Sequence, residues 1–137
     1  MRRLWTNFLI FLLLAAPAAA PAGSANYPPK LLTGKDSGTT LEIRPGERFT
    51  LDLRNPASGG FAEISPVFDP GVIRLVSKDL MPPLWTPEPR CGDFGRLVLV
   101  FEAVAAGNTD LTINVGRPRD KTKVALPFMK IAVKVRD

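Results

Sequence analysis

Hydrophobic and polar positions alternate with a period of two along much of the chain after residue 38. In "TTLEIR" and "RFTLDLR" every second residue is apolar, namely Leu41, Ile43, Phe49, Leu51 and Leu53. Such alternation is typical of β-strands with one buried face. Between the two segments, Pro45 presets φ and Gly46 accepts a positive φ, so we expect a tight turn there.

Five further segments predict strands in the same way. They are "GFAEIS", "VIRLVSK", "GRLVLVFEAV", "TDLTINV" and the C-terminal stretch in which Met129, Ile131, Val133 and Val135 alternate with polar residues. "GRLVLVFEAV" is apolar on both faces, which favours a central strand. The segments "PVFDPG" and "AAGN" carry turn residues. About seven short strands without an amphipathic helix predict an all-β, immunoglobulin-like β-sandwich.

The N-terminal stretch follows a different pattern. Arg2 and Arg3 precede an apolar run from Phe8 to Ala16, and small residues and prolines follow. This order predicts a secretory signal peptide, and the run is shorter than the roughly 20 residues of a transmembrane helix. Cleavage after Ala22 and cleavage after Ala25 both fit the preference for small residues.

These segments predict one exported domain. We expect a signal peptide and processing region at 1–25, an extended lead-in at 26–38 that precedes regular structure, and the β-sandwich at 39–137. About 112 to 115 mature residues suffice to bury a modest core. The mature protein is expected to be a soluble monomer, secreted or periplasmic, with no stable membrane association.

Charge adds little to this picture. The formal net charge is +5, and it falls to about +3 once Arg2 and Arg3 are removed with the leader. The basic residues are scattered and are not interleaved with aromatic residues. A nucleic-acid groove is therefore not expected.

Catalytic and metal-binding chemistry also finds little support. The chain has one cysteine, Cys91, and no histidine, so neither a Cys-His nor a Ser-His-Asp arrangement can form. The carboxylates in predicted loops, Asp69, Asp93 and Asp110, show no spacing typical of a catalytic pair or a metal site. We expect no catalytic residue, no metal and no cofactor, and hence no enzyme.

Three loop segments remain unusual, and "GRPRD" at residues 116–120 is one of them. "DLMPPLWTPEPRCGDFG" contains four prolines, so we expect a long loop that is either functional or a plain crossover between sheets. Trp85 within it either contacts a partner or covers the core. In "NPASGG", Pro56 and the glycines predict a thin, preorganised projection, although the same residues also occur in ordinary turns.

In their order, these loops resemble the motifs of the chagasin family of cysteine-protease inhibitors, and the resemblance extends from about Thr39 to the end of the chain. The family carries an Asn-Pro-Thr-Thr-Gly loop, a glycine-rich loop after prolines and an Arg-Pro-Trp loop. The matching residues here are Asn55, Pro56 and Gly59, then Pro82, Pro83, Gly92 and Gly95, then Arg117 and Pro118. The run "FEAVAAGNTDLTINVGRP" also resembles the family pattern.

The resemblance implies an inhibitor that blocks the active-site cleft of a papain-like cysteine protease with three loops, without a covalent bond or a cofactor. The implied protease-binding residues are Asn55, Pro56, Ala57, Ser58, Gly59, Gly92, Asp93, Phe94, Gly95, Arg117 and Pro118. The chain departs from the family at three points. Arg119 replaces a loop tryptophan, Gly60 is an insertion, and Glu63 lies near a second usual tryptophan position.

Loss of the loop tryptophan matters because tryptophan is a frequent binding hot spot. An alternative therefore stays open: an exported, non-inhibitory immunoglobulin-like module that recognises another protein through the same loops. Convergence of the three loops at one end of the sandwich would favour the inhibitor.

Overall fold

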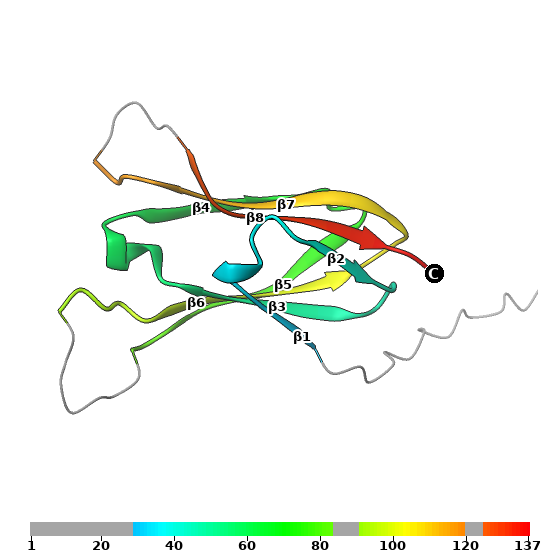
Figure 1. The fold of residues 1–137 in the computed structure, drawn as a ribbon, viewed down its shortest axis with the longest axis horizontal. Helices are drawn as coiled ribbons and strands as arrows, with labels where there is room; N and C mark the ends of the chain where they lie inside the picture. Colours follow the sequence, from blue (N-terminus) through cyan, green and yellow to red (C-terminus); the bar gives the residue numbers. More distant parts are fainter. Residues whose placement is uncertain (1–28, 84–90, 120–124) are drawn as a thin grey trace, which may run out of the picture.

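The structure consists of two four-stranded β-sheets packed face to face (Figure 1). It is a computed structural model that describes residues 29–83, 91–119 and 125–137. The strands are β1 (Lys30–Thr33), β2 (Thr40–Ile43), β3 (Arg48–Arg54), β4 (Ala62–Val67), β5 (Ile73–Met81), β6 (Arg96–Ala103), β7 (Gly107–Gly116) and β8 (Leu126–Val135). The sheet orders are β1-β3-β6-β5 and β2-β8-β7-β4. The predicted all-β sandwich is confirmed, with eight strands where about seven were expected.

The alternating positions of β3 and β6 build the core of the first sheet. These strands pair antiparallel, so that Phe49 lies opposite Phe101 and Leu51 opposite Leu99. All four side chains are fully buried, and the two phenylalanine rings stack with centroids 5.4 Å apart. Each such side chain contributes about 1.5–3 kcal/mol to stability on burial. β6 lies between β3 and β5, which confirms the predicted central strand.

The second sheet supplies the facing half of the core. β7 and β8 pair antiparallel, with Leu111 opposite Ile131 and Ile113 opposite Met129. These side chains are at most 1% exposed. The sequence periodicity therefore identified the inward face of both strands correctly, since polar neighbours such as Lys130 remain exposed.

Regular structure begins earlier than the sequence predicted. β1 lies within the segment expected to precede the domain, and it pairs parallel with β3, with Leu32 opposite Leu51. A short 3₁₀ helix, η1 (Gly34–Asp36), follows it and leads the chain across to β2 in the other sheet. The Asp36 carboxylate holds this turn by accepting a 2.7 Å hydrogen bond from the Thr33 N–H.

The turn expected between β2 and β3 is present. The Glu47 N–H donates to the Arg44 carbonyl at 3.1 Å, and Gly46 has a φ of 86°. The turn does not join neighbouring strands, because β2 and β3 belong to different sheets. It therefore forms one of the connections that close the sandwich.

Both edge strands on one side of the sandwich end later in the chain than the sequence suggested. β4 continues through Pro66, which an edge strand tolerates and which falls within a register shift between Ile64 and Val67. β5 extends to Met81, so that residues 79–81 belong to a strand and the predicted long loop is shorter. The sequence hid this extension because β5 contains a bulge at Val76, which reverses the alternation.

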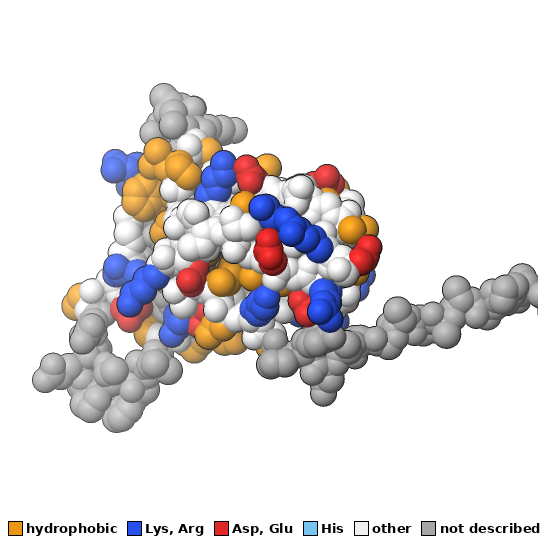
Figure 2. Space-filling view, turned by 45° about the vertical axis from the view of Figure 1, so that its right-hand side comes forward, with side chains coloured by type: hydrophobic (Ala, Val, Ile, Leu, Met, Phe, Trp, Pro, Cys, Tyr) orange, Lys and Arg blue, Asp and Glu red, His pale blue; other side chains and the backbone are white. Residues whose placement is uncertain are grey.

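Some predicted features lie outside the described residues. They include the signal peptide at 1–25 and Trp85. Within the described ranges, no helix has the length and apolar character needed to cross a membrane. Side chains of both charges are interspersed over the face seen in Figure 2, in agreement with the scattered distribution read from the sequence.

Candidate functional site

Three loops meet at one end of the sandwich, on the left in Figure 1. We call them loop A (Asn55–Gly60, between β3 and β4), loop B (residues 91–95, before β6) and loop C (residues 117–119, after β7). The strand pairing brings their bases together, since Arg54 lies opposite Arg96 and Ala62 lies opposite Gly116. The three loops singled out in the sequence therefore converge.

Loop A is a compact 3₁₀ turn, η2 (Pro56–Gly59). Asn55 caps it, because its Oδ1 accepts a 3.0 Å hydrogen bond from the Ala57 N–H, and Pro56 occupies the first turn, where no N–H is needed. Gly60 ends the turn in the left-handed region with a φ of 79°. The loop is thus preorganised, as expected.

Its shape differs from the predicted thin projection. Pro56 is buried, and the side chains of Ala57 and Ser58 are only partly exposed. Gly59 and Gly60 form the exposed part. A partner therefore meets mainly glycine backbone here, which allows a close approach.

Loops A and B are joined by three hydrogen bonds. The Asn55 N–H donates to the Gly95 carbonyl at 2.9 Å, and Asn55 Nδ2 donates to the Phe94 carbonyl at 3.0 Å. The Phe94 N–H donates to Ser58 Oγ, also at 3.0 Å. Asn55 therefore both caps its own turn and fixes the position of loop B.

Loop B depends on glycine and an aspartate turn. Gly92 and Gly95 have φ values of 84° and 87°. The Asp93 Oδ1 accepts a 2.9 Å hydrogen bond from the Gly95 N–H. A Cβ at Gly95 would lie 2.0 Å from the Met81 carbonyl oxygen, so only glycine fits between loop B and the end of β5.

Loop C joins the group through an aromatic contact. The Arg117 guanidinium carbon lies 5.6 Å from the centroid of the Phe61 ring, within the range of a cation–π interaction. Phe61 directly follows loop A, so the contact places Arg117 beside it. Pro118 and Arg119 are exposed beyond this point.

Glu63 makes an interaction that sequence reasoning missed. It pairs with Lys78, and this ion pair joins edge strand β4 of one sheet to edge strand β5 of the other. The Glu63 side chain is only 9% exposed, and its Oε1 has no hydrogen-bond partner among the described residues. The bulge at Val76 turns Lys78 towards the sheet interface, a shift that the regular alternation of the sequence did not reveal.

The three carboxylates considered for catalysis have structural partners, and Asp110 lies in strand β7 and not in a loop as expected. Asp69 Oδ1 accepts from the Gly71 N–H at 2.8 Å, Asp110 pairs with Lys130 at 3.2 Å, and Asp93 caps its own turn. Within the described ranges, no three potential metal ligands gather. Cys91 is a free, exposed thiol at the start of loop B.

Comparison with known proteins identifies the fold. No protein-family model matches the chain, and no curated protein matches it. Among solved structures, the cysteine protease inhibitor EhICP2 from Entamoeba histolytica aligns with a TM-score of 0.60 and 20% identity, over 78% of this chain and 94% of that one. Amebosin aligns with a TM-score of 0.51 and 16% identity, over 80% of this chain and 100% of that one.

A third structure, PbICP-C in complex with falcipain-2, covers 78% of this chain and 99% of that chain at 16% identity. Its TM-score of 0.43 is too low to support an argument about this chain. The fold assignment rests on the first two structures and on the sheet order. The chain therefore has the chagasin-type fold, and the resemblance inferred from the sequence is confirmed at the level of the fold.

Proposed function

We propose that this chain is an inhibitor of papain-family cysteine proteases and that loops A, B and C together block the active-site cleft. The observation that carries the proposal is that the three loops lie at one end of the sandwich. There, Asn55 and Ser58 of loop A hold Phe94 and Gly95 of loop B, and Arg117 of loop C lies over the Phe61 ring. EhICP2, which shares the fold, is a cysteine protease inhibitor.

Blocking requires a rigid surface and no chemistry of its own. Because the hydrogen bonds already order loops A and B, binding costs little further conformational entropy. The exposed Gly59 backbone allows close approach at the centre, and loops B and C flank it. Substrate is then excluded sterically, so neither a covalent bond nor a cofactor is required.

The altered motifs fit this mechanism to different degrees. Ser58 stands where the family has a threonine, and its hydroxyl is used to bind the Phe94 N–H. Arg119 replaces the loop tryptophan and is exposed. This replacement specifically favours the second candidate, a non-inhibitory binding module that recognises another protein through the same end.

We also propose export. The order of charged, apolar and small residues in the first 25 positions supports a cleaved secretory leader. After export, the protein acts as a monomer that is secreted or periplasmic, and it binds its protease in that compartment.

Inhibition of papain by the purified mature domain tests the proposal, with Gly59→Arg as the blocking variant. Gly59 is exposed, and an added Cβ would meet only the Phe61 ring at 3.3 Å. Gly34→Arg is the matched control, since Gly34 is exposed in η1 with nothing within 4 Å of a Cβ. We expect Gly59→Arg to weaken inhibition by roughly 30-fold or more and Gly34→Arg to leave it unchanged.

Two results would contradict the proposal. A folded parent that does not inhibit at tens of micromolar, about −6 to −7 kcal/mol of binding, would favour the binding module. Inhibition that is equally strong in Gly59→Arg would mean that loop A is not the inhibitory surface.

A further inference from the structure

Phe94 in loop B is an aromatic side chain that the fold leaves largely in solvent. Its exposed fraction is 58%, whereas Phe49 and Phe101 in the core are fully buried. Single exposed apolar residues are common on protein surfaces and need no explanation. Phe94 differs from them in the way its backbone is held.

Side chains of loop A bind both backbone polar groups of Phe94. Its N–H donates to Ser58 Oγ, and its carbonyl accepts from Asn55 Nδ2, each at 3.0 Å. The carbonyl of the next residue, Gly95, accepts a hydrogen bond from the Asn55 N–H, and Gly95 lies close against the Met81 backbone. The Phe94 backbone is therefore ordered before any partner arrives, and only the two χ torsions of the ring remain to be fixed.

The surface near Phe94 is also apolar. Leu80 and Met81 end strand β5 opposite Leu97 and Arg96, at the base of loop B. Their exposed fractions are 64% and 46%. Leu80 and Met81 are consecutive residues of a strand, so exposed apolar side chains lie on both faces of the β5 end beside loop B. Aromatic residues that become buried in a well-packed partner pocket dominate many interfaces.

We propose that Phe94 is the aromatic anchor of this surface, and that the protease receives its ring in an apolar pocket beside the active-site cleft. The inference rests on the proposed function and specifies the chemistry of the partner. Asn55 and Ser58 act as positioning residues for the ring. Phe94 supplies the large apolar contact that Arg119 does not provide at the position of the family tryptophan.

The test compares inhibition of papain by the parent, Phe94→Ala and Phe94→Leu. Leu31→Ala is the matched control, because Leu31 is 62% exposed on β1, outside the three loops. We expect Phe94→Ala to raise the inhibition constant by roughly 30-fold or more, Phe94→Leu by less than about 5-fold, and Leu31→Ala by less than about 2-fold. The melting temperature of Phe94→Ala should match that of the parent, since the ring is mostly in solvent.

The positioning role is measured with Ser58→Ala. Alone, it should weaken inhibition by roughly 3- to 10-fold, and it should add no further loss to Phe94→Ala, because the two residues act through the same ring. A purely structural role of Ser58 would instead give the same loss in both backgrounds.

The outcomes separate this inference from the function on which it rests. A folded parent that does not inhibit papain overturns both. A parent that inhibits, while Phe94→Ala inhibits within about 3-fold of it, overturns the anchor and leaves the inhibitor proposal standing.

Discussion

The two ends of the sandwich are built differently. At the loop end, loops A and B are joined largely through the side chains of Asn55 and Ser58. At the opposite end, backbone bonds mainly join one turn to the next: Gly46 N–H to Ala103 carbonyl at 2.9 Å, and Val104 N–H to Val72 carbonyl at 2.8 Å. Side chains such as Glu47 act there within a single turn. Side-chain bonds depend on residue identity, whereas backbone bonds survive most substitutions.

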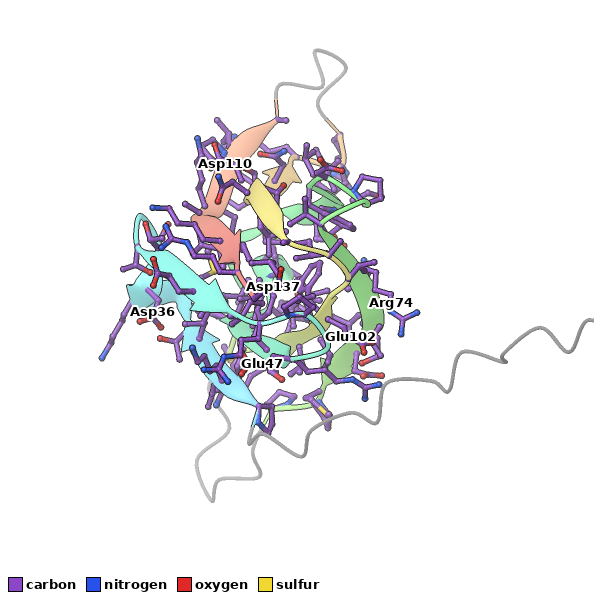
Figure 3. The ribbon with its side chains drawn as sticks, turned by 90° about the vertical axis from the view of Figure 1, so that its right-hand side faces the viewer. Asp36, Glu47, Arg74, Glu102, Asp110 and Asp137 are labelled. Atoms are coloured by element: carbon purple, nitrogen blue, oxygen red, sulfur yellow. The ribbon has the colours of Figure 1, made fainter. Side chains whose placement is uncertain are left out.

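The charges differ in the same way. Figure 3 views the end opposite the loops, where Arg74 and Glu102 are joined at 2.6 Å and Arg48 approaches the same carboxylate at 3.8 Å. At the loop end, Arg96 pairs with Asp52, whereas Arg117 and Arg119 are exposed and Arg117 contacts the Phe61 ring. Arg74 and Arg48 thus share a carboxylate of the domain, whereas Arg117 and Arg119 are exposed at the loop end.

The largest expected effect compares two glycines with nearly the same positive φ. Gly95 and Gly46 have φ values of 87° and 86°, but a Cβ would overlap the Met81 carbonyl at Gly95 and meet nothing within 4 Å at Gly46. We expect Gly46→Ala to cost about 1–2 kcal/mol and Gly95→Ala about 3–5 kcal/mol. Urea unfolding of both variants measures the difference.

Equal costs would mean that the backbone at Gly95 relaxes freely, and that the loop end is no more constrained than the opposite end. A larger cost at Gly95, with inhibition also lost, would confirm that the contact between loop B and β5 supports the binding surface.

A smaller loss of stability and inhibition is expected when one turn-holding polar residue is removed, either Asn55 at the loop end or Glu47 at the opposite end. Asn55→Ala removes the cap of η2 and the bond to Phe94, and should cost about 1–2 kcal/mol of stability and roughly 10-fold or more in inhibition. Glu47→Ala removes one bond to the Arg44 N–H at the opposite end. It should cost at most about 1 kcal/mol and leave inhibition unchanged.

Thermal unfolding and papain inhibition of the same two samples provide the readouts. If Glu47→Ala weakened inhibition as much as Asn55→Ala, the effect would come from general loosening of the domain and not from the loop end.

The strands that the sequence predicted correctly are those with unbroken alternation. In β3, β6, β7 and β8 the apolar residue at every second position proved to be buried. β1 was missed because it has four residues and leaves Leu31 exposed, so it shows no alternation. The end of β5 was missed because the bulge at Val76 interrupts the alternation and residues 78–81 are exposed, so no buried face marks this part of the strand.

The loops of the candidate site were predictable from proline and glycine, but the contacts between them were not. Asn55 and Phe94 are 39 residues apart, and nothing in the local sequence of either residue indicates that a side-chain amide joins them. The pairing of Glu63 with Lys78 is equally non-local, since it needs both the sandwich and the bulge. Local propensity selects turns, whereas the strand register decides which turns meet.

The smallest expected effect contrasts one arginine from each end. Arg74→Ala breaks the ion pair with Glu102, whose carboxylate also lies near Arg48. Arg117→Ala removes the cation–π contact with Phe61. Each should cost about 0.5–1 kcal/mol of stability. Only Arg117→Ala should weaken inhibition, by roughly 3-fold, because Arg117 lies beside loop A.

Inhibition of papain at low and high salt measures this effect, which should shrink as salt screens the charge. A 3-fold loss that persists unchanged at high salt would assign the effect to packing on Phe61, and an equal loss in Arg74→Ala would remove the distinction between the two ends.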